Sequence, residues 1–166
     1  MAIQKILIAV DDSKYAEHAA EFGFDMARFY NSEVGLVSIV EPIILPTSGN
    51  DSITGLAATE INVGDEAEML RIQTDAAQNM MNRIIEKYAL ELKISHFTEY
   101  GLTADGIIKC ATEFGADMIV VGTHNRTGLD RLFMGSVAEH VVRHSKVPVL
   151  VVPLRESESS HKSESQ

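Results

Sequence analysis

Residues 118–142 read MIVVGTHNRTGLDRLFMGSVAEHVV, and this stretch decides the fold. It opens with an apolar, β-branched run that predicts a buried strand. A polar loop then begins at Gly122 and ends at Gly135-Ser136, directly before a helical pattern. The first amides of a helix have no partner inside the helix, and the helix dipole favours negative charge there. A strand, a glycine-bounded loop and a helix start in this order therefore predict a site for an anion such as a phosphate.

The same alternation extends along the rest of the chain. Apolar runs predict strands at residues 6–10, 34–40, 92–100, 117–121 and 147–152. Three- and four-residue spacings predict helices at residues 14–30, 65–90, 104–114 and 135–144. Asp12 or Ser13 is expected to cap the first helix and Thr103 the third, with Gly115 just past its end. Strands that alternate with helices predict an α/β fold with a parallel sheet covered on both faces.

Two segments differ from this pattern. Residues 41–64 form a long connection rich in Pro and Gly, which predicts either a functional lid or disorder. Residues 155–166 contain no apolar side chain, so we expect a disordered polar tail after a domain at residues 1–154. In the long helix between them, Met69, Met80 and Met81 are expected to fill the core.

Composition, charge and apolar run length argue against several classes of protein. The 166 residues carry a formal net charge of −10, which disfavours nucleic-acid binding because phosphate backbones need clustered cations. The single cysteine, Cys110, allows no disulfide within the chain and fits a reducing compartment. We find no signal peptide and no apolar run long enough to span a membrane, so the expected location is cytoplasmic.

The loop motif resembles that of the universal stress protein family. The family pattern is Gly, two residues, Gly, nine residues, Gly and then Ser or Thr; Gly122, Gly135 and Ser136 match it, whereas Asn125 replaces the second glycine. The resemblance extends over residues 5–152 and implies a Rossmann-like sheet with strand order 3-2-1-4-5, as in the adenine nucleotide alpha hydrolase-like proteins. Ligands of such sheets bind at the carboxyl ends of the strands where the winding reverses, here between the first and fourth strands.

The resemblance also implies roles for individual residues. The amides of Gly135, Ser136 and Val137 are expected to meet phosphate oxygens of ATP or a related adenine nucleotide, and Gly122 is expected near the ribose. Asp11 matches the acid that contacts the adenine or ribose side in the family. Mg²⁺ would come mainly with a triphosphate, and the carboxylates of Asp11 and Asp12 would help to hold it.

Three further residues have open interpretations. Ile39 is either an apolar wall for the base or simple core. Arg126 is placed to pair with phosphates. Asn125 tolerates left-handed φ and keeps its N–H, so it either preserves the loop or blocks the phosphate with its side chain.

No catalytic constellation is recognisable in the sequence. There is no nucleophile elbow and no P-loop lysine, so at most slow ATP hydrolysis is expected. His124 has no visible partner as a base, and Arg131 is interpreted as surface charge. His140 and His144 are spaced for a metal but lack a third ligand in the sequence, so we predict no metal site.

The last strand, from Val147 to Val152, is almost wholly apolar and would lie at a sheet edge in the family order. The resemblance therefore implies a homodimer through this strand, although Pro148 removes one donor. Three functions follow. The first is a dimeric module for stress response or signalling that binds an adenine nucleotide. The second is a dimeric interaction protein of the same family without nucleotide, and the third is an enzyme acting on phosphate esters or anhydrides.

Overall fold

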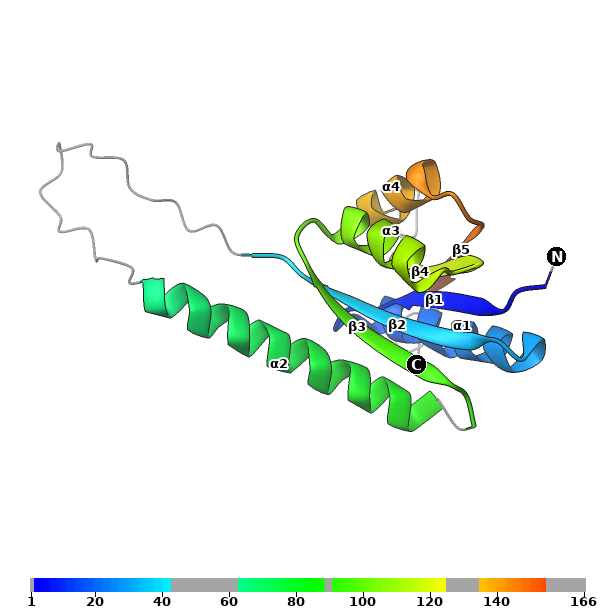
Figure 1. Ribbon diagram of the computed structural model, residues 1–166, viewed down its shortest axis with the longest axis horizontal. Helices are drawn as coiled ribbons and strands as arrows, with labels where there is room; N and C mark the ends of the chain where they lie inside the picture. The colour runs from blue at the N-terminus through cyan, green and yellow to red at the C-terminus, as the bar shows by residue number, and fades with distance from the viewer. Residues whose placement is uncertain (1, 43–62, 89–90, 125–134, 155–166) are drawn as a thin grey trace, which may run out of the picture.

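The computed structural model describes residues 2–42, 63–88, 91–124 and 135–154 (Figure 1). Five parallel strands form one sheet in the order β3-β2-β1-β4-β5, which confirms the predicted fold and strand order. The strands are β1 (Lys5–Ala9), β2 (Glu33–Val40), β3 (Ile94–Tyr100), β4 (Met118–His124) and β5 (Val149–Leu154). The helices are α1 (Lys14–Tyr30), α2 (Val63–Tyr88), α3 (Thr103–Phe114) and α4 (Ser136–His144).

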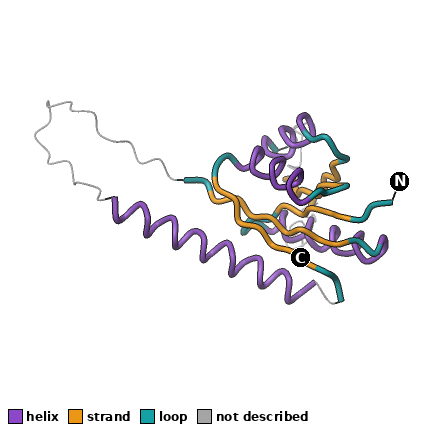
Figure 2. The backbone as a smooth tube through the Cα atoms, viewed as in Figure 1, coloured by secondary structure: helices purple, strands orange, loops and turns teal. Residues whose placement is uncertain are grey.

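The helices form two layers, one on each face of the sheet (Figure 2). One core cluster joins α1 and α2 to the sheet, and Phe24 and Met81 are fully buried within it. The other joins α3 and α4 to the opposite face, around Ile107 and Val141. The central strand β1 is buried between both layers, which explains why its sequence is a continuous apolar run.

Helix α1 has well-defined ends. The Ser13 hydroxyl oxygen accepts a hydrogen bond from the Ala16 amide, so Ser13 is the N-cap, one of the two residues expected. Asn31 ends the helix with a left-handed φ of 56°. Gly115 ends α3 in the same way with a φ of 71°, as predicted.

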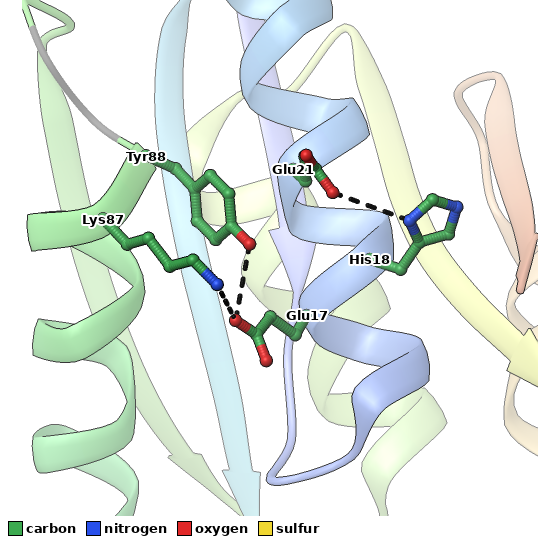
Figure 3. A network of polar contacts seen from close by, with 5 residues as sticks. All are labelled: Glu17, His18, Glu21, Lys87 and Tyr88. Carbon is green, nitrogen blue, oxygen red and sulfur yellow. Dashed lines mark hydrogen bonds and ion pairs between the residues drawn. The ribbon is translucent and has the colours of Figure 1, made fainter.

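Polar contacts tie α2 to one side of α1. The Lys87 ammonium lies 2.7 Å from a Glu17 carboxylate oxygen, and the Tyr88 hydroxyl donates to the same oxygen across 3.4 Å (Figure 3). The Lys87 hydrogen bond lowers the pKa of the Glu17 carboxyl and raises that of the lysine. Phe24 stacks on Tyr88 from the same side of α1. The position of α2 leaves the other side of α1 uncovered by that helix.

Several predicted boundaries were wrong. Strand β4 continues through Gly122 to His124, because these residues pair with the end of β5. Strand β5 begins at Val149 and not at Val147; Pro148 precedes it, and its carbonyl accepts a hydrogen bond from Ile119. Thr103 does not cap α3, since it is the first residue of the helix and Leu102 is the N-cap.

The prediction for the methionines of α2 was only partly correct. Met80 and Met81 are buried, whereas Met69 is exposed, as are Leu70 and Ile72. Figure 1 shows the reason: the first half of α2 extends past the end of the sheet and has no layer to pack on. The predictions for most of the 41–64 connection and for the 155–166 tail lie outside the described residues.

Candidate functional site

A cavity of about 250 Å³ opens where β1 and β4 end side by side. Its wall is mainly apolar and comes from β1, β2, β4 and the first turns of α1, α3 and α4. Six of the residues predicted for the site line it, namely Asp11, Ile39, Gly122, Gly135, Ser136 and Val137. Asn125, Arg126 and Arg131 lie outside the described residues, so their predicted roles stay predictions.

The start of α4 forms one wall of this crevice. Gly135 is the N-cap, and its carbonyl accepts the first helical hydrogen bond, from the Glu139 amide. The amides of Ser136, Val137 and Ala138 precede that bond, and no acceptor for them lies among the described residues. Since these three residues line the cavity, an anion bound there has free N–H donors within reach.

The amide of Gly135 is used differently from the prediction. It donates to the Thr123 hydroxyl oxygen across 3.1 Å, so it is not free for a phosphate in this structure. This bond joins the end of β4 to the start of α4. A Cβ built on Gly135 would lie 3.6 Å from the same oxygen, an ordinary contact, and its φ of −56° suits any residue. Nothing in the described part of the protein therefore requires glycine at this position.

Gly122 is required for a different reason. A Cβ there would lie 2.5 Å from the Tyr15 carbonyl oxygen, which belongs to the first turn of α1. Glycine lets the first turn of α1 approach β4 closely beside the crevice. This close approach explains the first motif glycine without a ligand.

Asp11 lies in the turn between β1 and α1 and is exposed. One of its carboxylate oxygens accepts a hydrogen bond from the Ser13 amide across 3.0 Å. Ser13, and not Asp11, caps α1. Asp11 lines the cavity, so its carboxylate lies where a ligand could meet it.

The first amide of α3 is capped by a side chain from another element. Glu41, just after β2, accepts hydrogen bonds from the Thr103 amide, at 3.1 Å, and from the Thr103 hydroxyl. These bonds, the one from the hydroxyl above all, lower the pKa of the Glu41 carboxyl. Ile39, two residues earlier, lines the cavity and lies where a Cβ on Gly106 of α3 would fall, which shows that it also packs in the core.

Sequence reasoning missed several residues of the crevice, among them Thr103, Ile107, Thr123 and Ala138. Thr123 directly follows Gly122, and that adjacency was the available signal. Nothing in the sequence marks the contact of Thr103 with Glu41, since the two are 62 positions apart.

The two histidines of α4 have hydrogen-bond partners of their own. His140 Nε2 lies 3.0 Å from an Asp105 carboxylate oxygen of α3, and the His144 ring nitrogen Nδ1 lies 2.8 Å from the His140 carbonyl oxygen. Within the described part of the chain no group of three ligating side chains is arranged to hold a metal.

Burial raises the pKa of the Cys110 thiol to about 12. No helix among the described residues is long and apolar enough to cross a membrane.

Comparison with known proteins gives one consistent answer. A family model described as the universal stress protein family matches residues 2–153. A universal stress protein of Methanocaldococcus jannaschii is 31% identical over 159 residues, which are 93% of this chain and 97% of that protein. The solved structure of the same protein superposes with a TM-score of 0.72 at 27% identity and covers 95% of this chain and 100% of its own.

Two further solved structures contain ligands. A universal stress protein from Archaeoglobus fulgidus in complex with dAMP has a TM-score of 0.58 at 22% identity, and covers 92% of this chain and 99% of its own. A universal stress protein in complex with cAMP has a TM-score of 0.55 at 21% identity, and covers 92% of this chain and 98% of its own. At these identities the likeness is one of fold.

Proposed function

Since this chain belongs to the universal stress protein family, we propose that it binds an adenine nucleotide, ATP or a relative of it, in the crevice between β1 and β4. The observation that carries this proposal is the open start of α4, where three successive residues line the cavity and their amides have no acceptor among the described residues. A phosphate supplies the acceptors, and the dipole of α4 favours its charge.

The rest of the crevice suits the remainder of a nucleotide. Ile39, Val37 and Ile107 give an apolar surface against which a base packs. Asp11 at the rim offers a carboxylate to ribose hydroxyls. The dAMP and cAMP complexes of related folds support this class of ligand. Any Mg²⁺ would arrive with a triphosphate, and the exposed carboxylates of Asp11 and Asp12 fit such an ion.

The second proposal concerns assembly. We infer a homodimer through antiparallel pairing of β5, because this edge strand is apolar and pairs with β4 alone among the described strands. The proposed role is that of a module in stress response or signalling. The alternative is a dimeric interaction protein of the same family that binds no nucleotide because Asn125 blocks the phosphate.

Calorimetric titration of ATP with Mg²⁺ tests the nucleotide proposal. Wild-type protein is expected to bind with micromolar affinity. Gly135→Asp is expected to weaken binding at least tenfold, because a carboxylate at the N-cap occupies the anion site. Gly135→Asn is the matched control, with the same shape and no charge, and a smaller loss is expected.

The alternative gives a different result in the same experiment. If the wild type does not bind and Asn125→Gly does, the side chain of Asn125 is the block and the alternative is correct. If neither protein binds ATP, dAMP or cAMP, the nucleotide proposal is wrong.

A further inference from the structure

Two threonine hydroxyls in the crevice have opposite hydrogen-bond polarity. Thr103, at the start of α3, donates its hydroxyl proton to a Glu41 carboxylate oxygen. The hydroxyl oxygen of Thr123, at the end of β4, accepts a hydrogen bond from the Gly135 amide across 3.1 Å, a bond that does not use its own proton. Both threonines line the cavity, so a ligand meets two hydroxyls that differ in what they offer.

The polarity of Thr103 is fixed by the charge of Glu41. An ionised carboxylate only accepts hydrogen bonds, and the bonds from Thr103, that of its hydroxyl above all, lower the pKa of this carboxyl. A hydroxyl has a single proton, and its bond to a charged acceptor is about twice as strong as one to a neutral acceptor. The Thr103 oxygen therefore keeps only its lone pairs for the cavity, where it is suited to accept a hydrogen bond from a ligand.

Thr103 also lies beside the apolar wall proposed for the base. Ile107 follows one turn later on α3, and Ile39, two residues before Glu41, lies where a Cβ on Gly106 of the same helix would fall. The open start of α4 is on the other side of the crevice, where β4 ends. Since β1 lies between β2 and β4, these two strand ends are two strand spacings apart, roughly 10 Å. An acceptor near the base thus stands apart from the donors for a phosphate.

We propose that Thr103, held by Glu41, selects the base of the bound nucleotide: its hydroxyl oxygen accepts a hydrogen bond from the exocyclic amino group of adenine and disfavours the carbonyl oxygen that hypoxanthine carries in the same place. This inference rests on the nucleotide site proposed above and names the residue that decides which base it takes. A carbonyl oxygen there would place two acceptors against each other with no proton between them. A site that hydrogen-bonds one group of a ligand rejects analogues without that group. Thr103 is then the specificity residue, and Glu41 is a positioning residue that acts through it.

Calorimetric titrations of the full chain with ATP and with ITP, the hypoxanthine counterpart of ATP, test the inference. The wild type is expected to bind ATP at least about tenfold more tightly than ITP. Thr103→Val keeps the shape of the side chain and the amide that Glu41 caps, but it removes the oxygen, so most of this preference is expected to disappear. Thr103→Ser keeps a hydroxyl and is expected to retain it.

A second probe separates the amino group from the rest of the base. Inosine also carries a hydrogen on the adjacent ring nitrogen, whereas purine riboside triphosphate has neither that hydrogen nor the amino group. The wild type is expected to bind this compound less tightly than ATP, and Thr103→Val is expected to bind the two about equally.

Two further variants test the polarity itself. In Glu41→Ala the Thr103 hydroxyl loses its acceptor and is free to donate to a carbonyl oxygen, so affinity for ITP is expected to rise while affinity for ATP changes little. Thr123→Val is the matched control at the other threonine. It is expected to weaken ATP and ITP by the same factor, because both carry the same triphosphate.

Each outcome has one meaning. Equal affinity of the wild type for ATP and purine riboside triphosphate, or a preference for ATP over ITP that is unchanged in Thr103→Val, overturns the role of Thr103 and leaves the nucleotide site standing. The same preference in Glu41→Ala as in the wild type overturns the positioning role of Glu41. A wild type that binds none of these nucleotides overturns both the inference and the proposed function. The wild-type titrations need no variant, so the test does not depend on how any substitution folds.

Discussion

The starts of α3 and α4 face the same crevice, but among the described residues a side-chain carboxylate accepts from the first helical amide only at α3. At α3 the Glu41 carboxylate accepts hydrogen bonds from the amide and hydroxyl of Thr103. At α4 the N-cap is a glycine without a side chain, and three amides have no acceptor in the described part of the protein. At α3 the protein itself supplies the anion, the Glu41 carboxylate that follows β2. At α4 no side chain does so among the described residues, and a ligand could supply the anion.

The difference indicates how a ligand would lie in the crevice. A carboxylate already occupies the positive end of α3, so a phosphate is repelled there and attracted to α4. The apolar residues between the two starts, such as Ile39 and Ile107, are then left for the base. The orientation of the proposed nucleotide therefore depends on Glu41 as well as on the glycine motif.

The largest expected effect concerns Gly122, the glycine on which α1 packs. Gly122→Ala is expected to lower the free energy of unfolding by about 2–3 kcal/mol, because its Cβ would meet the backbone of Tyr15 at 2.5 Å. In Gly135→Ala, at the start of α4, the new Cβ makes only an ordinary contact, so the free energy of unfolding is expected to change by less than about 0.5 kcal/mol. Urea denaturation followed by circular dichroism measures both values. Equal midpoints for the two variants would show that the two glycines do not differ in this way.

A smaller effect is expected when the closed start is opened. Glu41→Ala leaves the Thr103 amide without its acceptor and is expected to cost about 1 kcal/mol of stability, as the loss of a helix cap does. Glu41→Gln keeps an acceptor oxygen and should lose less. Denaturant titrations of the three proteins at pH 7 give the comparison, and a loss in Glu41→Gln as large as in Glu41→Ala would argue against capping.

The smallest expected effect is a pH dependence. The folded pKa of Glu41 is lowered, so its ionised form contributes stability above the unfolded pKa of about 4.3, and this contribution is lost as the pH falls through the folded value. The difference in unfolding free energy between wild type and Glu41→Gln should therefore be constant near neutrality and shrink below about pH 4. Glu17, whose pKa is also lowered, is present in both proteins and cancels. A difference that does not change with pH would show that the charge of Glu41 is not involved.

Some features were predictable because they depend on neighbours in sequence. The apolar run of β1, the cap at Ser13 and the left-handed turn at Gly115 each follow from residues a few positions apart. The strand–loop–helix motif placed Gly135, Ser136 and Val137 in the crevice for the same reason. Strand order came from the family resemblance and was confirmed.

The errors came from contacts between distant segments. The end of β4 was placed too early because its last residues are polar, and they become a strand only by pairing with β5. Met69 was expected in the core because its spacing suits a helix face, yet periodicity does not show where the sheet beneath α2 ends.

The amino-acid sequence by itself determined the α/β class, the alternation of elements and the glycine motif at the start of α4, because each follows from the periodicity and backbone preferences of residues close together in the chain. Only the tertiary structure decided that Gly122 is a packing requirement of α1 and that Glu41 closes α3. Each of these depends on two elements meeting across the fold, and the distance between two side chains in space is not encoded in their separation along the chain.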